Sequence, residues 1–129
     1  MEGSEVTPEG AIYEFWASFG LPAFEENNLP DDAGFPRITY ELATDAYGSE
    51  VALTASLWYR GTSLVDINNK TAEIQRRIGL GGVLLPCEGG RIWIKAAQPF
   101  AQTMGDGADD MIRRKLINIS ADFLVNPGR

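Results

Sequence analysis

The chain has 129 residues, 44% of them apolar, which suits one globular domain over residues 1–129. Acidic residues outnumber basic ones by 18 to 11, and a net charge of −7 is poorly suited to gripping nucleic-acid phosphates. Histidine is absent, which removes the commonest zinc ligand and the side chain most often used for proton transfer near neutral pH. Composition therefore weighs against nucleic-acid binding, histidine-based catalysis and histidine zinc sites.

The cellular setting follows from short apolar runs and a single cysteine. The longest apolar runs, such as Gly82 to Pro86, fall far below the roughly 18 residues that cross a bilayer, so no transmembrane helix and no membrane partner are expected. The N-terminus carries Glu2 and Glu5 and lacks the basic region of a signal peptide. Cys87 alone cannot form an internal disulfide, which agrees with a cytoplasm as the place of synthesis.

Residues 8–20 predict the first helix, because Thr7 suits the N-cap, Pro8 the first position and Gly20 the residue past the end. Its apolar residues recur at helical spacing and form one stripe: Ile12, Phe15, Trp16 and Phe19. The next segment, Leu21 to Pro36, is predicted as a long loop because prolines, asparagines and aspartates interrupt both periodicities. Loops of this length are often functional.

Two alternating segments, Arg37 to Ala43 and Val51 to Tyr59, predict a hairpin. The connection from Thr44 to Glu50 is longer than a tight turn and is expected to project from the sheet. Trp58 and, further on, Trp93 fall in the polar phase of their strands. That face is therefore either covered by a helix or meets another chain.

A second helix is predicted from Leu64 to Ile78, with Ser63 and Asp66 as a capping box and Gly79 at its end. Its inward stripe is expected to lie across the sheet and consists of Leu64, Ile67, Thr71, Ile74 and Ile78.

Further strands are expected at Val83 to Cys87 and Arg91 to Lys95, as a hairpin, with Pro99 to Thr103 extending it at an edge. Met111 to Val125 alternates and predicts a long last strand. The fold class is therefore α+β, with a mostly antiparallel sheet of about four to five strands and two helices packed mainly on one face.

No motif predicts a catalytic, cofactor-binding or metal-binding residue. Asp106, Asp109 and Asp110 do not match the spacing of a calcium-binding loop, and a solvated loop is the favoured interpretation. Cys87 has no histidine to activate it and is expected to be buried and inert. An enzyme that uses the carboxylate pair Asp109 and Asp110 stays as the weaker alternative, and it would need a concave pocket around strongly shifted carboxylates.

The one concentrated basic run, Arg113 to Lys115, follows the acidic Gly105 to Asp110 segment. Two interpretations stay open for it. Opposite charges on one rim could steer contacts between neighbouring subunits. They could equally be solvated strand ends.

Stretches across most of the chain resemble the tail terminator proteins of long-tailed phages and prophages, also called tail-completion, tail-to-head joining or minor capsid proteins. These stretches are Leu21 to Asn27 with Pro30-Asp31-Asp32, Ile38 to Glu41, Leu53 to Arg60 (LTASLWYR), Ile78 to Val83, Ile92 to Lys95, Pro99 to Gln102 and Asp109 to Arg114 (DDMIRR). None of them is a catalytic signature.

The resemblance implies a structural subunit that forms a ring, expected to be a hexamer, on the end of a tail tube. Such a ring ends tube polymerisation and joins the tail to the head. The implied partners are the chain itself, the tail tube protein and a head-completion (stopper) protein, with DNA only passing through the channel. The implied location is the virion, assembled in the host cytoplasm, with no cofactor. We further hypothesise that the acidic excess lines the channel and repels DNA.

Contacts along and around the ring are expected in the loops at residues 21–36 and 45–50 and in the segment 105–114. The candidate interface residues are Asp45, Tyr47, Glu50, Asp106, Asp109, Asp110, Arg113 and Arg114. Two alternatives stay open: a neighbouring head–tail connector or stopper, and a generic protein-interaction module of a secretion-type machine.

Overall fold

The computed structural model describes residues 6–42, 50–105 and 109–125. Three of the candidate interface residues, Asp45, Tyr47 and Asp106, lie outside these ranges. The elements in chain order are α1 (Pro8–Ala17), β1 (Ala23–Glu25), β2 (Arg37–Tyr40), β3 (Glu50–Arg60), α2 (Val65–Ile78), β4 (Val83–Cys87), β5 (Gly90–Met104) and β6 (Ile112–Val125).

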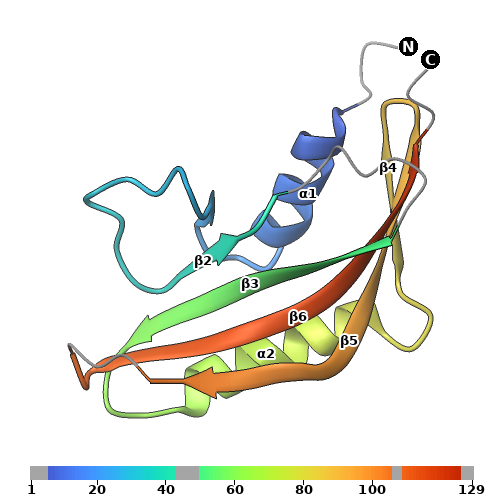
Figure 1. The fold of residues 1–129 in the computed structure, drawn as a ribbon. Coiled ribbons are helices and arrows are strands. Elements are labelled where there is room, and N and C mark those ends of the chain that lie inside the picture. Colours follow the sequence, from blue (N-terminus) through green and yellow to red (C-terminus); the bar gives the residue numbers. More distant parts are fainter. Residues whose placement is uncertain (1–5, 43–49, 106–108, 126–129) are drawn as a thin grey trace.

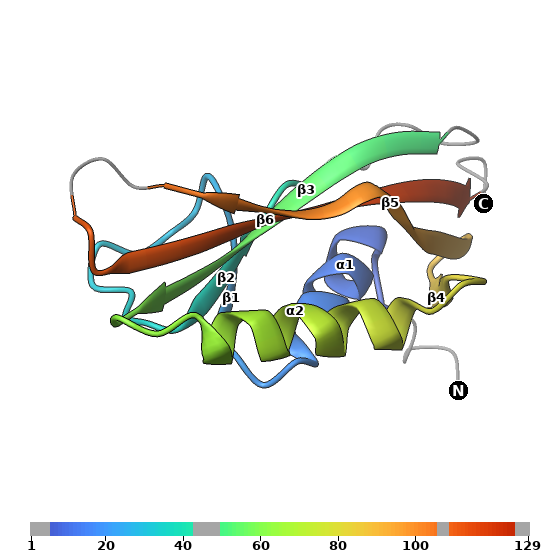
Figure 2. The same cartoon turned by 90° about the horizontal axis from the view of Figure 1, so that it is seen from below.

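The strands of the described chain form one six-stranded sheet in the order β1-β2-β3-β6-β5-β4. All neighbouring pairs are antiparallel except β1 and β2. The long strands β3, β5 and β6 curl together (Figure 1), and both helices lie on the same face of the sheet (Figure 2). This confirms the α+β class and the one-sided helices, whereas the expected count of about four to five strands is too low.

The additional strand lies inside the segment predicted as loop. Ala23–Glu25 pairs in parallel with β2, with Ala23 opposite Ile38. The three residues are too few for an alternating pattern, and Pro22 precedes them, so local periodicity carries no signal for this strand. The strand exists because β2 offers an open edge and because Ala23 buries its side chain.

Helix α1 begins as predicted, since the Thr7 hydroxyl accepts a hydrogen bond from the Gly10 N–H at 3.0 Å. It ends at Ala17, two residues before the end that Gly20 indicated, and Gly20 adopts a φ of 85° in the turn that follows. The predicted stripe is confirmed, because Ile12, Phe15, Trp16 and Phe19 are all buried.

The prediction for α2 was right for its buried stripe and wrong at its start. The N-cap is Leu64, and no side chain caps it, so the expected capping box does not form. The Ser63 hydroxyl instead accepts a hydrogen bond from the Val65 N–H at 3.1 Å. Leu64, which precedes the first helical residue, is 43% exposed. The other four residues of the stripe are buried: Ile67, Thr71, Ile74 and Ile78.

The core lies between the helices and the inward phases of β3, β5 and β6. Ile92, Ile94, Ile117 and Phe123 are completely inaccessible to solvent. Each such side chain contributes about 1.5–3 kcal/mol when fully buried. The alternating residues on these strands point to the opposite side of the sheet, which is termed the helix-free face because no described helix covers it.

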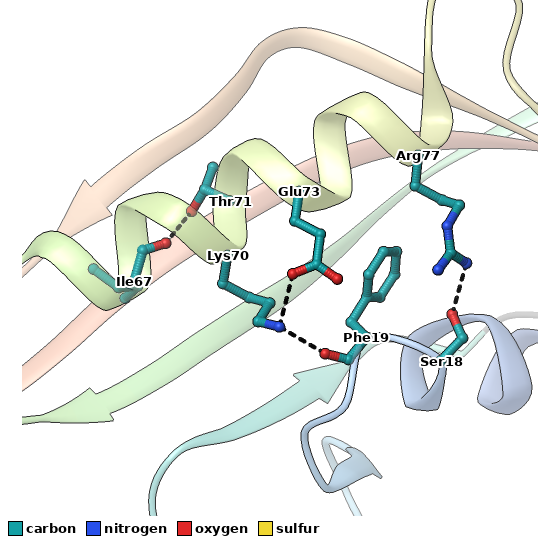
Figure 3. A network of polar contacts seen from close by, with 7 residues as sticks. All are labelled: Ser18, Phe19, Ile67, Lys70, Thr71, Glu73 and Arg77. Atoms are coloured by element: carbon teal, nitrogen blue, oxygen red, sulfur yellow. Dashed lines mark hydrogen bonds and ion pairs between the residues drawn. The ribbon is translucent and has the colours of Figure 1, made fainter.

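Polar contacts fasten α2 to the end of α1 (Figure 3). The Lys70 ammonium donates to the Phe19 carbonyl oxygen at 2.7 Å and pairs with the Glu73 carboxylate at 2.8 Å. The Arg77 guanidinium donates to the Ser18 hydroxyl at 3.0 Å and lies over the Phe19 ring. The two helices therefore form one layer that closes over the core. In the described chain neither helix is long and apolar enough to cross a bilayer.

Candidate functional site

The described candidate interface residues separate into two groups at opposite ends of β3 and β6. Glu50 opens the 11-residue strand β3, opposite Asp122 near the end of β6. Arg113 and Arg114 lie at the start of β6, opposite Tyr59 and Trp58 at the other end of β3. At about 3.3 Å per residue, the two groups are roughly 30 Å apart. The candidates therefore do not form one patch.

Asp109 anchors the corner where β6 begins. Its carboxylate accepts a hydrogen bond from the Met111 N–H at 2.9 Å and forms an ion pair with Arg60 at 2.6 Å. The Met111 N–H is the larger cause, and Arg60 the next, of a pKa of Asp109 that lies below its ordinary value. Because both partners of this ion pair are partly exposed, the pair contributes little to stability and mainly fixes the corner.

The basic run after Asp109 is divided between the two faces of the sheet. Arg113 donates to the Thr62 carbonyl oxygen at 3.3 Å, and Lys115 donates to Asn68 at 2.7 Å, both on the helix side. Arg114 points to the helix-free face. Within the chain, Asp109 pairs with Arg60, a residue 49 positions away, and the expected charge contact between neighbouring subunits stays a prediction.

A row of three side chains crosses the helix-free face near the same corner. Arg37 of β2 is directly opposite Trp58 of β3, and Trp58 is directly opposite Arg114 of β6. The two guanidinium carbons lie 5.3 Å and 4.8 Å from the indole ring centroid, within the range of cation–π attraction. These three residues are termed the Arg–Trp–Arg row. Sequence reasoning singled out Trp58 and Arg114 but missed Arg37, which only the strand register brings to them.

The row is held in place by further contacts. The Trp58 N–H donates to the Thr39 hydroxyl at 2.8 Å, and Arg114 donates to the Ser56 hydroxyl at 3.1 Å. Arg37 lies 4.5 Å from the Phe35 ring centroid, and burial lowers its pKa. In the described part of the chain, no carboxylate forms an ion pair with Arg37 or Arg114.

The opposite end of the helix-free face carries the second tryptophan. The Lys95 ammonium pairs with Glu50 at 2.9 Å and lies 4.4 Å from the Trp93 ring centroid. A hydrogen bond from Lys95 is the largest cause of a pKa of Glu50 below its ordinary value, followed by one from Ser120. Both tryptophans therefore lie, half-buried, on the face without a described helix, where their indole N–H groups donate to Thr39 and to the Gly81 carbonyl oxygen. Contact of this face with another chain stays a prediction.

The described residues offer limited chemistry. No group of three or more histidine, cysteine or acidic residues is placed to hold a metal ion within the described ranges. Asp110 and Arg114 help to line a pocket of ≈ 290 Å³ at the start of β6. The Cys87 side chain is buried, as expected.

No family model of the known protein families matches this chain. No curated protein matches it either.

Proposed function

We propose that this chain is a structural phage protein of the tail terminator type. It assembles as a ring, expected to be a hexamer, caps the tail tube, ends tube polymerisation and joins the tail to the head. One observation carries the proposal. The contact candidates of a single small domain lie on separate surfaces, at two ends roughly 30 Å apart and on the helix-free face between them.

Each subunit of a ring between a tube and a head needs several different contact surfaces. Neighbours in a cyclic ring meet head-to-tail, so each subunit needs two different complementary lateral surfaces. The tube and the head-completion protein each need one more. We assign the Glu50 end of the β3–β6 ladder and, at its other end, the corner formed by Asp109 and Arg60 to these two axial partners. The helix-free face is left for neighbouring subunits, with DNA only passing through the channel.

Two of the stretches that carry the resemblance meet in space, which supports the assignment. Leu53 to Arg60 forms most of β3, and Asp109 to Arg114 reaches it at the corner. Arg60 and Asp109 join the two stretches directly, and Trp58 and Arg114 are cross-strand neighbours. Parts of the sequence that resemble one family thus build one local structure.

A structural role is proposed over a catalytic one, with no cofactor. A catalytic acid needs a carboxyl group whose pKa is raised toward neutrality. Among the described carboxylates with a shifted pKa, Glu50, Glu73 and Asp109 are all shifted downward by hydrogen bonds, Glu50 from Lys95, Glu73 from Lys70 and Asp109 from the Met111 N–H. Such shifts are typical of surface ion pairs.

A capping assay tests the proposal. Purified tail tube protein is polymerised with and without the chain, and tube lengths and ends are measured by negative-stain electron microscopy. The wild-type chain is expected to arrest growth and to appear as a ring on tube ends. Tubes that grow equally long in its presence contradict the proposal.

Charge reversals assign the ends. Glu50→Lys and Arg60→Glu alter opposite ends of β3, and Glu14→Lys on the exposed side of α1 is the matched control. We expect one end variant to lose capping and the other to cap tubes but fail to join heads. The control variant is expected to cap tubes and to join heads. Equal behaviour of all three variants contradicts the assignment.

A further inference from the structure

We infer that the Arg–Trp–Arg row of one copy binds the acidic loop between β1 and β2 of a second copy of this chain. The acidic loop is residues 26–32, with the exposed carboxylates of Glu26, Asp31 and Asp32. The inference names a lateral contact of the proposed ring. Only the arrangement of the copies in a ring depends on the proposed function. The contact between two copies does not depend on it.

The two guanidinium groups of the row are preorganised for binding an anion. Each guanidinium lies against the Trp58 indole, and the indole is fixed by its hydrogen bond to Thr39. Side chains that are already ordered lose less conformational entropy on binding. Burial disfavours the charge of Arg37, and no described carboxylate forms an ion pair that would compensate it. A carboxylate from a second copy would stabilise that charge.

The acidic loop is ordered, projects from the chain and carries carboxylates that form no ion pair in the described chain. Figure 1 shows the connection between β1 and β2 extending away from the helices and the sheet. Two turns order it, with hydrogen bonds from the Asn28 N–H to the Glu25 carbonyl and from the Ala33 N–H to the Pro30 carbonyl. None of its three carboxylates forms an ion pair within the described chain.

The geometry favours a contact between copies over a contact within one. Arg37 donates to the Ala33 and Gly34 carbonyls at 3.3 Å each, so it holds the returning end of its own loop. The carboxylates lie further along, in the part that projects. Loop and row carry opposite charges, so a contact between copies pairs the row of one copy with the loop of another.

A second copy is also a better occupant than a nucleic acid. The chain carries a net charge of −7, which repels a polyanion, while one pair of arginines would neutralise few phosphates. Another copy offers the acidic loop instead, where a few exposed carboxylates match the two arginines of the row. Such a contact is expected to weaken as salt rises.

The test is a charge swap followed by sedimentation equilibrium of the full chain at low and high salt. Arg114→Glu reverses the row, Asp31→Lys with Asp32→Lys reverses the loop, and Arg76→Glu on the exposed side of α2 is the matched control for charge. Arg114→Gln serves as a second row variant in case the reversal impairs folding, and circular dichroism checks each variant.

The row and loop variants are each expected to self-associate at least about tenfold more weakly than wild type, and their mixture is expected to recover most of the loss. The self-association of Arg76→Glu should stay near that of wild type.

The inference is overturned by a mixture that associates no more tightly than its components, by equal effects of Arg76→Glu and Arg114→Glu, or by a wild-type chain that stays monomeric up to about 1 mM. Binding of duplex DNA that is lost in Arg114→Glu, without self-association, would assign the row to a polyanion instead. Failure of the capping assay would refute the proposed function without changing these outcomes.

Discussion

The Lys70 ammonium donates a hydrogen bond to the Phe19 carbonyl oxygen at 2.7 Å, and so α2 holds the chain where it leaves α1 (Figure 3). The Lys70 side chain is only 19% exposed, which limits the water available to replace the contact. The position of α1 on the sheet therefore depends on a residue 51 positions away.

Lys70→Met is expected to lower the free energy of unfolding by about 1–2 kcal/mol, because the Phe19 carbonyl loses a charged donor while the aliphatic packing is kept. Urea denaturation followed by tryptophan fluorescence measures the loss. Arg76→Met, on the exposed side of the same helix, should change it by less than about 0.5 kcal/mol. Equal losses in the two variants would show that the contact with Phe19 carries no special weight.

Gly82 is expected to tolerate no side chain. Its φ is 82°, and an added Cβ would lie 2.6 Å from both the Ile94 carbonyl oxygen and the Trp93 indole nitrogen. Gly82→Ala should therefore cost about 2–4 kcal/mol, from backbone strain together with a clash that the sheet cannot relieve. Gly81→Ala is the matched control, because a Cβ there meets nothing within 4 Å. A thermal melt in which both variants match wild type would contradict the packing of Gly82 against β5.

Asp109 is expected to contribute to acid sensitivity. Its folded pKa lies below the ordinary value, chiefly through the Met111 N–H and then through Arg60. The resulting stabilisation is fully present above the unfolded pKa and is lost as pH falls through the folded pKa, so wild type should lose stability below about pH 5. Asp109→Asn should flatten this slope, and Arg60→Gln should flatten it less. The reverse ranking in urea titrations between acidic and neutral pH would contradict the order of causes.

Tyr59 is expected to contribute to alkaline sensitivity. Burial raises its pKa above 10.0, helped by the nearby carboxylates of Asp66 and Glu73. A raised folded pKa gives stability that is complete below the unfolded pKa and is lost as pH rises through the folded one. Tyr59→Phe should therefore make stability less dependent on pH above about pH 10. Identical alkaline slopes for wild type and Tyr59→Phe would contradict the burial of the phenol.

The sequence predicted the features that depend on local periodicity. Alternation in β3 and β6 identified the buried side chains of Leu57, Ile117 and Phe123, and the stripe of α1 was correct throughout. Local periodicity could not predict the pairing of strands that lack a pattern of their own. The parallel strand Ala23–Glu25 has no pattern of its own and depends on the open edge of β2.

The candidate site shows the same division. Trp58 and Arg114 were recognisable as unusual residues, but Arg37 joins them only through the registers of β2 with β3 and of β3 with β6. The ion pair of Asp109 with Arg60 joins residues 49 positions apart, and no local pattern in the sequence indicated it. Alternation along β6 sends Arg113 and Arg114 to opposite faces of the sheet.

The most direct test of the proposed function is to delete the gene in the phage or prophage that carries it and to image the lysate by electron microscopy. A tail terminator predicts full heads without tails beside loose tubes of uncontrolled length. Full heads beside unattached tubes of normal length would indicate a joining or stopper protein instead. Normal infectious particles would contradict a role in tail assembly altogether.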